Sequence, residues 1–403
     1  MGTTLLLSFS ILLLVAVLVS ERAHRTVLST AVLFLVGGFV LGSGVTDVLV
    51  IGPDDDIVTL LAELALFSVL FTDGMRVGLA DLRQAWRLPG RALLLGLPLT
   101  LLVTALLAHY VVGLPWLEAF LLAAVLAPTD PVFASAIVGR QEVPARLRHV
   151  LNVESGVNDG LALPIVLVLL AAAGGSETSG WTLVEEILLG IAVGVVIPWV
   201  VLRLERLPHL QATKNLEPLL ILSIGLLVLS ISHATHANLF LAAFAAGVTV
   251  ATTNPDFRDA FEQFGELVSE LLKLAAILVF GALITPAFLF GEISVAGWVF
   301  AVSAIVVARP VALLVSLWRS QLDARERAAA MWFGPKGFAS VVYGLIVLES
   351  GIDRADQLFH LVALVIVLSI LAHSSTDVVV AKQFQSDGPD EPDGDAAPVR
   401  RTG

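Results

Sequence analysis

The sequence predicts an all-α polytopic membrane protein, and three observations lead to that class. The 403 residues are 57% hydrophobic and only 14% charged, whereas a soluble domain is about 25% charged. Apolar runs of about 17–25 residues, each long enough to cross a bilayer, recur along the chain. Two of these runs are interrupted near their centres by proline or glycine beside a charged residue. We therefore expect about thirteen transmembrane helices, two of them discontinuous.

Short loops join the apolar runs into one transmembrane domain, residues 1–382. Arg22 and Arg25 follow the first run, which lacks a cleavage pattern, so we expect it to remain as a span rather than act as a signal peptide. Residues 383–403 are acidic and rich in proline and glycine, which predicts a disordered tail. The expected spans are residues 3–20, 26–42, 57–73, 91–112, 114–138, 147–172, 183–202, 216–232, 236–253, 265–290, 293–318, 326–349 and 356–380.

The basic residues predict the orientation of these spans. Cytoplasmic loops of membrane proteins carry an excess of lysine and arginine. In this chain they gather in alternate loops, whereas the opposite loops hold only Arg354. We expect a multi-pass protein of the plasma membrane with its N-terminus outside and its C-terminus in the cytoplasm. The basic residues of the cytoplasmic side are Arg22, Arg25, Arg76, Arg83, Arg87, Arg91, Arg140, Arg146, Arg148, Arg203, Arg206, Lys214, Arg258, Arg319, Arg325, Arg327, Lys382, Arg400 and Arg401.

The two interrupted spans predict an inverted repeat. Span 5 is broken at Pro128-Thr129-Asp130-Pro131, and span 12 is broken at Gly334-Pro335-Lys336-Gly337. They lie seven spans apart, so they cross the membrane in opposite directions. Paired broken helices at corresponding positions mark the binding site of many secondary transporters. The half-helix ends also favour charges, because an N-terminus attracts an anion and a C-terminus a cation. Asp130 and Lys336 are placed to compensate such ends.

Span 6 carries the densest group of polar residues, in the segment ESGVNDG. Each residue of an α-helix turns the chain by about 100°, so Ser155 stacks with Asp159 and Glu154 with Asn158. Glu154 and Asp159 point about 140° apart. Asp159 and Ser155 would form an oxygen site beside the break in span 5. Glu154 needs another partner, and Arg309 in span 11 is the arginine expected within a span. A buried charge requires a counter-charge, so we predict a structural Glu154–Arg309 ion pair.

Asp159 has no obvious permanent cation and is the predicted exchange site. A desolvated carboxylate can hold a proton or a small cation, but not both at once. The oxygen donors of Asp159, Asp130, Ser155 and Thr129 suit a hard monovalent ion such as Na⁺. Asn158 stands where a second carboxylate would precede Asp159. One titrating group predicts one proton exchanged for one cation, without net movement of charge.

Other charged residues have weaker predicted roles. Asp73 closes span 3 and could draw cations into a cytoplasmic funnel. Lys273 lies within reach of Glu266 and Glu270 on its own helix, so packing or snorkelling is its expected role. The chain has no cysteine, which excludes thiolate metal sites, and we predict no cofactor. Its formal charge of −12 gives no indication of nucleic-acid binding.

With these residues in hand, the sequence resembles the monovalent cation:proton antiporters, in particular the electroneutral sodium/proton branch. The resemblance covers about residues 5–380. Its most specific parts are Thr129-Asp130-Pro131 and Glu154-Ser155-Gly156 followed by Asn158-Asp159, with support from LFTDGMRVGLADLR, Ala308-Arg309-Pro310 and the GPKG break.

The resemblance implies a homodimer whose protomers have two parts. A transport bundle would comprise about residues 91–172 and 293–380, and a dimerisation part about 1–90 and 183–290. The bundle would shift like an elevator between inward-open and outward-open states. Asp159 and Asp130 would bind the ion, with oxygens from Ser155 and Thr129. Asn158 would mark the electroneutral branch. Relatives often carry arginine at the position of Lys336, which leaves the contact of this side chain open.

Several functions were weighed against one another. Exchange of Na⁺, with Li⁺ as a further substrate, for H⁺ is the leading hypothesis, and K⁺/H⁺ exchange on the same scaffold is the alternative. A cation channel would not need paired broken helices. An intramembrane hydrolase with Ser155 as nucleophile would need a buried histidine or lysine base beside it, and the sequence offers none that is convincing. We therefore do not expect an enzyme.

Overall fold

The structure, a computed structural model, describes residues 2–23, 29–76, 88–130, 137, 143–174, 180–320 and 322–385. Three predicted features lie outside the described residues. They are Pro131 with most of the second half of span 5, the basic loop that contains Arg83 and Arg87, and the tail from residue 386 onward.

The described part of the chain is helical and covers the predicted spans except for most of the second half of span 5. Eight helices are long and apolar enough to cross a membrane, and shorter apolar helices supply parts of the rest. The chain is therefore an all-α polytopic membrane protein. In chain order the elements are α1 (Gly2–Ala23), α2 (Thr30–Leu41), α3 (Asp56–Arg76), α5 (Leu88–Arg91), η1 (Ala92–Gly96), α6 (Leu97–Leu107), η2 (Ala108–Val112), α7 (Trp116–Val125), α9 (Ala145–Ala172), α10 (Gly180–Glu205), η4 (Lys214–Leu216), α11 (Glu217–Thr235), α12 (Leu239–Thr253), α13 (Pro255–Leu283), η5 (Phe288–Glu292), α14 (Val295–Ser303), η6 (Ala304–Ala308), α15 (Arg309–Ser316), α16 (Ala324–Trp332), α17 (Phe338–Glu349) and α18 (Ala355–Gln385).

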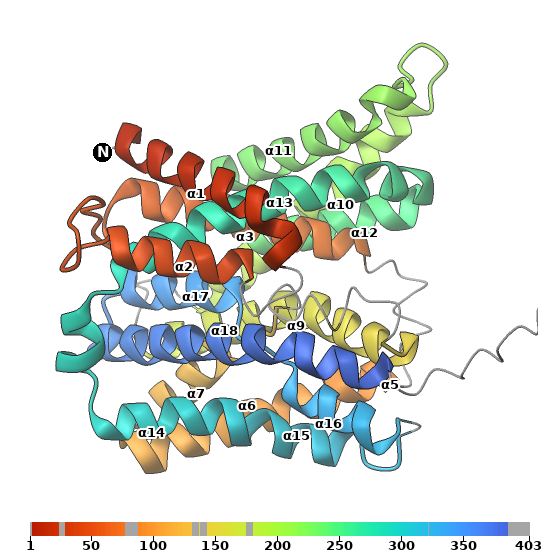
Figure 1. Ribbon diagram of the computed structural model, residues 1–403. Helices are drawn as coiled ribbons and strands as arrows, with labels where there is room; N and C mark the ends of the chain where they lie inside the picture. Colours follow the sequence, from red (N-terminus) through yellow and green to blue (C-terminus); the bar gives the residue numbers. More distant parts are fainter. Residues whose placement is uncertain are drawn as a thin grey trace, which may run out of the picture.

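The helices form two groups that are mixed in sequence but separate in space (Figure 1). One group, here called the scaffold, contains α1–α3 and α10–α13. The other, here called the bundle, contains α5–α7, α9 and α14–α18. Within the bundle, α9, α17 and α18 lie on the side that faces the scaffold (Figure 1). The described helices of the scaffold lie within residues 2–76 and 180–283, and those of the bundle lie within residues 88–172 and 295–385. The assignment of the first group to dimerisation and of the second to transport stays a prediction.

Glycine pairs allow the scaffold helices to pack closely. A Cβ added to Gly38 of α2 would collide with the backbone of Leu278 and Gly281 in α13. Gly74 of α3 lies in the same way against Gly247 of α12. Small residues bring helix backbones together in a bilayer, where the hydrophobic effect does not drive helix association. The scaffold is thus a tightly packed layer against which the bundle rests.

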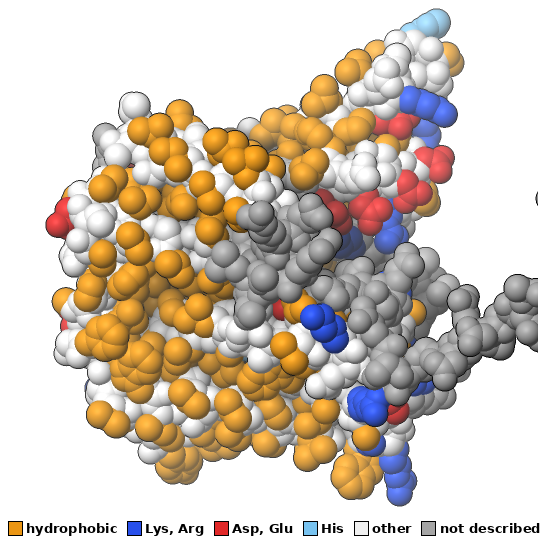
Figure 2. Space-filling model, viewed as in Figure 1, with side chains coloured by type: hydrophobic (Ala, Val, Ile, Leu, Met, Phe, Trp, Pro, Cys, Tyr) orange, Lys and Arg blue, Asp and Glu red, His pale blue; other side chains and the backbone are white. Residues whose placement is uncertain are grey.

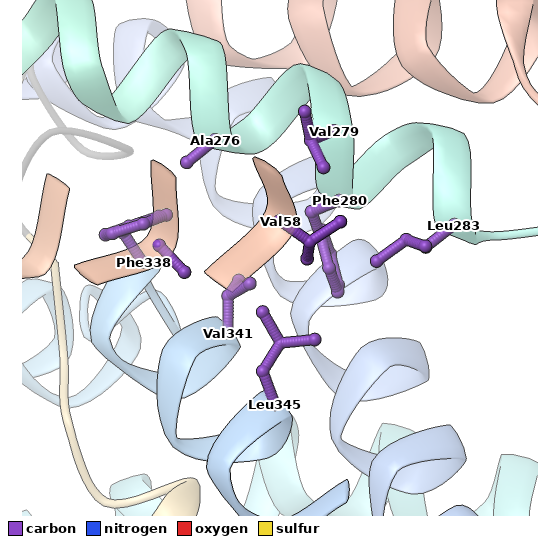
Figure 3. Close-up of a pocket in the computed structure, with 9 residues that line it drawn as sticks. Val58, Ala276, Val279, Phe280, Leu283, Phe338, Val341 and Leu345 are labelled. Atoms are coloured by element: carbon purple, nitrogen blue, oxygen red, sulfur yellow. The ribbon is translucent and has the colours of Figure 1, made fainter. Parts of the chain in front are cut away.

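An apolar seam joins the scaffold to α17 of the bundle. Val58 and Ala62 of α3 and Phe280 of α13 face Phe338 and Val341 of α17 across a small cavity (Figure 3). At the end of the seam, the Thr59 hydroxyl donates a hydrogen bond of 2.8 Å to Glu349 Oε1.

The surface view fits a protein surrounded by lipid. Hydrophobic side chains cover most of the visible face, and lysine and arginine side chains gather toward one end (Figure 2). Exposed leucine, valine and isoleucine side chains are spread over α1, α10, α11 and α15, including Leu18, Leu188 and Leu314. Such a surface would be unfavourable in water and matches the apolar interior of a membrane.

Candidate ion-binding site

The two helix breaks meet inside the bundle. Helix α7 ends at Val125, and an irregular segment carries the chain through Thr129 to Asp130. Helix α16 ends at Trp332, and α17 begins at Phe338. The backbone N–H of Asp130 donates a hydrogen bond of 2.9 Å to the carbonyl oxygen of Pro335. One break therefore satisfies a polar backbone group of the other at a depth where water is scarce.

The carboxylate of Asp130 also contacts the second break. Its Oδ2 atom accepts a hydrogen bond of 3.5 Å from the N–H of Phe338, the first residue of α17. A helix N-terminus has unpaired N–H groups and a partial positive charge, so a carboxylate stabilises it. The sequence predicts this role for Asp130 at the second half of span 5, most of which lies outside the described residues; the contact with the half-helix of span 12 was not predicted. Gly337 makes the approach possible, because a Cβ there would overlap the Asp130 side chain.

Thr129 is held between two residues of α9. Its hydroxyl accepts a hydrogen bond of 2.7 Å from the side-chain amide of Asn158, whose Oδ1 lies 3.4 Å from the Thr129 N–H. The hydroxyl of Ser155 donates to the Thr129 carbonyl oxygen. Asn158 and Ser155, three residues apart on α9, therefore both bond to Thr129. All of these side chains are at most 6% exposed.

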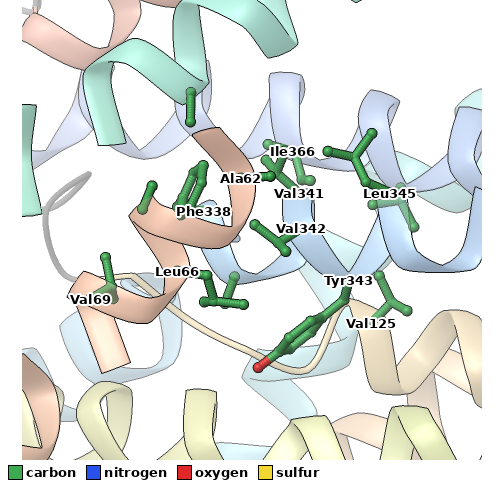
Figure 4. Close-up of a cluster of buried hydrophobic side chains, with 14 of the residues drawn as sticks. Ala62, Leu66, Val69, Val125, Phe338, Val341, Val342, Tyr343, Leu345 and Ile366 are labelled. Carbon is green, nitrogen blue, oxygen red and sulfur yellow. The ribbon is translucent and has the colours of Figure 1, made fainter. Parts of the chain in front are cut away.

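Asp159 lies beside this cluster with part of its carboxylate unpaired. The residue is 3% exposed, and its Oδ1 atom has no hydrogen-bond partner among the residues that the structure describes. Its backbone carbonyl accepts a hydrogen bond of 2.7 Å from the hydroxyl of Tyr343 in α17, a side chain shown in Figure 4. Asp73, Asp130, Lys273 and Lys336 are the charged groups that act electrostatically on Asp159. An unpaired, buried carboxylate oxygen is the group most in need of a cation or a proton.

Tyr343 was not predicted from the sequence. The chain has only two tyrosines, and a tyrosine within a buried span normally requires a partner for its hydroxyl. A tyrosine inside a predicted span was therefore the sequence feature that could have pointed to a polar contact at this position. Its hydrogen bond ties α17 to the turn of α9 that carries Asp159.

Glu154 and Arg309, which the sequence analysis pairs, are in contact. Arg309 Nη1 donates to Glu154 Oε1 at 2.6 Å, and Nη2 donates to Oε2 at 3.0 Å. The bidentate geometry is the strong form of an arginine–carboxylate pair. Nη2 also donates to the Ala330 carbonyl of α16 at 3.2 Å. Both side chains are buried, so three bundle helices meet at one charge pair.

Irregular backbone on both sides of Arg309 accompanies its position beside Glu154. The π-helical turn η6 directly precedes it, and Pro310 follows. Proline removes a backbone donor, and π turns often accompany such disruptions near functional sites. Gly334 in the second break leaves room for the guanidinium, because a Cβ at that position would overlap Arg309.

Lys336 is buried in the second break, at 4% exposure. None of the described residues accepts a hydrogen bond from its ammonium group. It therefore does not bond the last carbonyls of α16, and any compensation of that helix end acts through space. Glu154, Asp159 and Arg309 are the charged groups that act on it.

Asp73 and Lys273 approach the site from the scaffold. Asp73 pairs with Arg76 at 3.4 Å, and Arg76 also pairs with Glu266 of α13. Lys273, 8% exposed, pairs with Glu270 at 3.2 Å. Lys273 is thus packed within the protein rather than snorkelling at its edge. Both Asp73 and Lys273 act electrostatically on Asp159, which links scaffold charges to the bundle site.

Paired broken helices around buried acids, in an all-α membrane fold, define a secondary transporter. Sequence comparison specifies the family. Residues 9–382 match the family described as sodium/hydrogen exchanger, transmembrane. The chain belongs to this family and is a monovalent cation/proton antiporter.

Curated relatives and solved structures agree with this assignment. The K(+)/H(+) antiporter NhaP2 of Shewanella baltica (strain OS223) is 26% identical over 98% of this chain and 68% of its own length. The K(+)/H(+) antiporter NhaP of Alkalimonas amylolytica is 24% identical over 94% of this chain and 66% of its own length. The sodium proton antiporter MjNhaP1 from Methanocaldococcus jannaschii, solved at pH 8, superposes with a TM-score of 0.75 at 19% identity, covering 92% of this chain and 98% of that one. This last likeness concerns the fold.

Proposed function

We propose that the protein exchanges one monovalent cation for one proton, and that both compete for the carboxylate of Asp159. The unpaired Oδ1 atom of this buried residue carries the proposal. Protonation neutralises the carboxylate, and a bound cation does the same, so either one lowers the cost of a buried charge. Asp130, Thr129 and Ser155 contribute the neighbouring oxygens.

Some residues of the site hold Thr129 in place, and others supply oxygen atoms to the ion. Asn158 and Ser155 fix Thr129 through hydrogen bonds to its hydroxyl and carbonyl groups. A serine hydroxyl that donates to Thr129 still offers its lone pairs to a cation. Because residue 158 is an amide, Asp159 is the one acid of that pair that exchanges a proton. Transport of one cation against one proton is then electroneutral.

Na⁺ is the first candidate substrate, and K⁺ is the second. Na⁺, with Li⁺ beside it, is supported by the resemblance to the electroneutral sodium/proton branch and by the small, hard oxygen donors of the site. K⁺ is favoured by the curated relatives, which are named K(+)/H(+) antiporters. Side-by-side assays with Na⁺, Li⁺ and K⁺ decide between them.

The membrane setting follows from the same proposal. The distribution of basic residues over alternate loops supports a plasma-membrane protein with its N-terminus outside and its C-terminus in the cytoplasm. In this orientation, Asp73 stands at the cytoplasmic mouth of the site. The bundle is the moving part, and the scaffold is the part through which two protomers associate.

The decisive assay uses purified protein in liposomes that contain a pH-sensitive dye. Addition of the transported cation to wild-type protein should dissipate an imposed pH gradient, and Asp159→Asn should abolish this response. Asp353→Asn, which neutralises an exposed loop carboxylate, is the matched control and should retain the wild-type rate. An Asp159→Asn variant that exchanges normally would refute the assignment of the site.

Competition predicts a specific pH dependence. Lowering the pH should raise the apparent KM for the cation, because protons occupy more of the Asp159 carboxylates. The maximal rate at saturating cation should change less over the same pH range. Initial rates measured across a matrix of pH and cation concentrations test this relation. A KM that is independent of pH would argue for separate proton and cation sites.

Electroneutrality is tested with an imposed membrane voltage. The steady-state cation gradient should stay constant when a potassium gradient and valinomycin clamp the voltage at different values, in experiments with Na⁺ as substrate. A gradient that follows the voltage would mean that charge moves in each cycle, and the one-for-one stoichiometry would be wrong.

A further inference from the structure

Three side chains of helix α18, those of Ser369, His373 and Thr376, contact the residues that flank the break in span 12. The imidazole Nε2 of His373 lies 2.9 Å from the carbonyl oxygen of Trp332, the last residue of α16. The hydroxyl of Ser369 accepts a hydrogen bond of 2.8 Å from the N–H of Lys336. The indole of Trp332 donates to the Thr376 hydroxyl at 2.9 Å. Both ends of the break are therefore attached to α18.

Ser369 and His373 are also bonded to each other. His373 Nδ1 lies 3.1 Å from the Ser369 hydroxyl and 2.7 Å from the Ser369 carbonyl. Both ring nitrogens of His373 face carbonyl oxygens, Nδ1 that of Ser369 and Nε2 that of Trp332, and a carbonyl oxygen only accepts. Each contact is a hydrogen bond where that nitrogen carries a proton, and the tautomer protonated on Nε2 donates to Trp332. Ser369 is fully buried and His373 is 2% exposed. These contacts engage backbone groups on both sides of the interruption, where a helix end leaves N–H and carbonyl groups outside its regular hydrogen-bond pattern. The Trp332 carbonyl also accepts from the Gly334 N–H at 3.1 Å.

The same break presents its other contacts to the ion site. The Pro335 carbonyl accepts from the Asp130 N–H, Gly337 lies against the Asp130 side chain, and Gly334 lies against Arg309. The Trp332–Lys336 segment is thus fixed by α18 at its ends and contacts Asp130 between them. A shift of this segment would move Asp130 relative to Asp159.

We propose that His373, with Ser369, is a positioning residue for transport: it sets the geometry of the span 12 break and thereby the affinity of the site at Asp130 and Asp159. His373 touches neither the cation nor the carboxylates. Its effect is carried by the Trp332 carbonyl and the Lys336 N–H. This inference rests on the proposed function, because it requires that Asp130 and Asp159 bind the transported ion.

Two amide substitutions separate positioning from general packing. Gln in His373→Gln can place its amide nitrogen near the position of Nε2 and donate to Trp332. Asn in His373→Asn is shorter and reaches only the Ser369 side. We expect His373→Asn to raise the apparent KM for the cation by about three- to tenfold, the cost of one buried hydrogen bond. His373→Gln should stay close to wild type.

The experiment measures KM and maximal rate in proteoliposomes for wild type, both amide variants, Ser369→Ala and Ser375→Ala. Ser369→Ala removes the acceptor for Lys336 N–H and should also raise KM, which provides a second test if a His373 variant does not fold. Ser375 is exposed and bonds only within α18, so Ser375→Ala should behave as wild type. Size-exclusion profiles and melting temperatures identify variants that misfold.

The outcomes are distinguishable. An unchanged KM in His373→Asn and Ser369→Ala, with normal wild-type exchange, would overturn the positioning role alone. Equal impairment of His373→Gln and His373→Asn would show that the Trp332 bond is not what matters, and would also overturn it. Absence of cation/proton exchange in the wild-type protein would instead refute the proposed function.

Discussion

At the scale of single residues, three buried acids close together in the fold have three different surroundings. Glu154 is saturated by a bidentate arginine. Asp130 accepts from the first N–H of α17. Asp159 keeps one oxygen unpaired among the described residues. The unpaired oxygen is why we propose Asp159, among these three acids, as the group that exchanges a proton.

The Glu154–Arg309 pair should contribute to stability. Removing one partner of a buried pair leaves the other charge uncompensated, which costs about 3–5 kcal/mol. We expect Glu154→Ala and Arg309→Ala each to lower the melting temperature of the detergent-solubilised protein. Arg76→Ala is the matched control, because its pair with Glu266 is partly exposed, at 42% and 45% for the two side chains, and such pairs contribute about 0–1 kcal/mol. Wild-type melting in both buried-pair variants would contradict this role.

The sequence could identify the Glu154–Arg309 contact because few charges lie within spans and each needs a partner. It predicted no contact partner for Asn158, only its position on the helix face of Glu154. In the structure, Asn158 and Ser155 both bond to Thr129. The angular spacing of side chains on one helix does not say which neighbouring helix they meet, so this partner depended on tertiary packing.

At the scale of elements, the breaks depend on glycine as much as on charge. The GPKG segment was recognisable in the sequence as an interruption, but the purpose of each glycine was not. Gly334 accommodates Arg309, and Gly337 accommodates Asp130. The partner of Asp130 was also beyond sequence reasoning, because its carboxylate caps a half-helix more than two hundred residues away. Which helix end a carboxylate stabilises depends on how distant helices pack together, and a local sequence pattern does not contain that information.

Gly337→Ala should disturb the site more than its small size suggests. The added methyl group would overlap Cβ of Asp130, so either the break or the aspartate must move. We expect a strong loss of exchange in the liposome assay with only a modest fall in melting temperature. Gly291→Ala is the control, because a Cβ there meets nothing within 4 Å. Normal exchange by Gly337→Ala would mean that the Asp130 position tolerates displacement.

At the scale of the whole molecule, the resemblance implied two parts, a transport bundle and a dimerisation part, and those roles stay a prediction; the contacts between scaffold and bundle were not predicted. The seam of α3 and α13 against α17 consists of ordinary apolar side chains such as Val58, Phe280 and Val341, which resemble any other span residues in the sequence. In the proposed cycle this seam must open, because an outward-open state requires a path to Asp159 between scaffold and bundle.

A cross-link across the seam should stop transport. The natural chain has no cysteine, so Thr59→Cys combined with Glu349→Cys introduces one defined pair at positions that are hydrogen-bonded in the structure. We expect a short thiol-reactive bridge to abolish exchange in the double variant and to leave each single variant active. A cross-linked double variant that still exchanges would exclude relative movement at this seam.

The hydrogen bond between the Asp130 N–H and the Pro335 carbonyl has an evolutionary consequence. It joins two main-chain segments, so a side-chain replacement does not delete its donor or acceptor, except a proline at position 130, which lacks the N–H. Alanine scanning would leave it intact. Side chains in both halves of the repeat can therefore change while the Asp130–Pro335 hydrogen bond still joins the two breaks. Substitutions that change which ion is bound need not remove this bond.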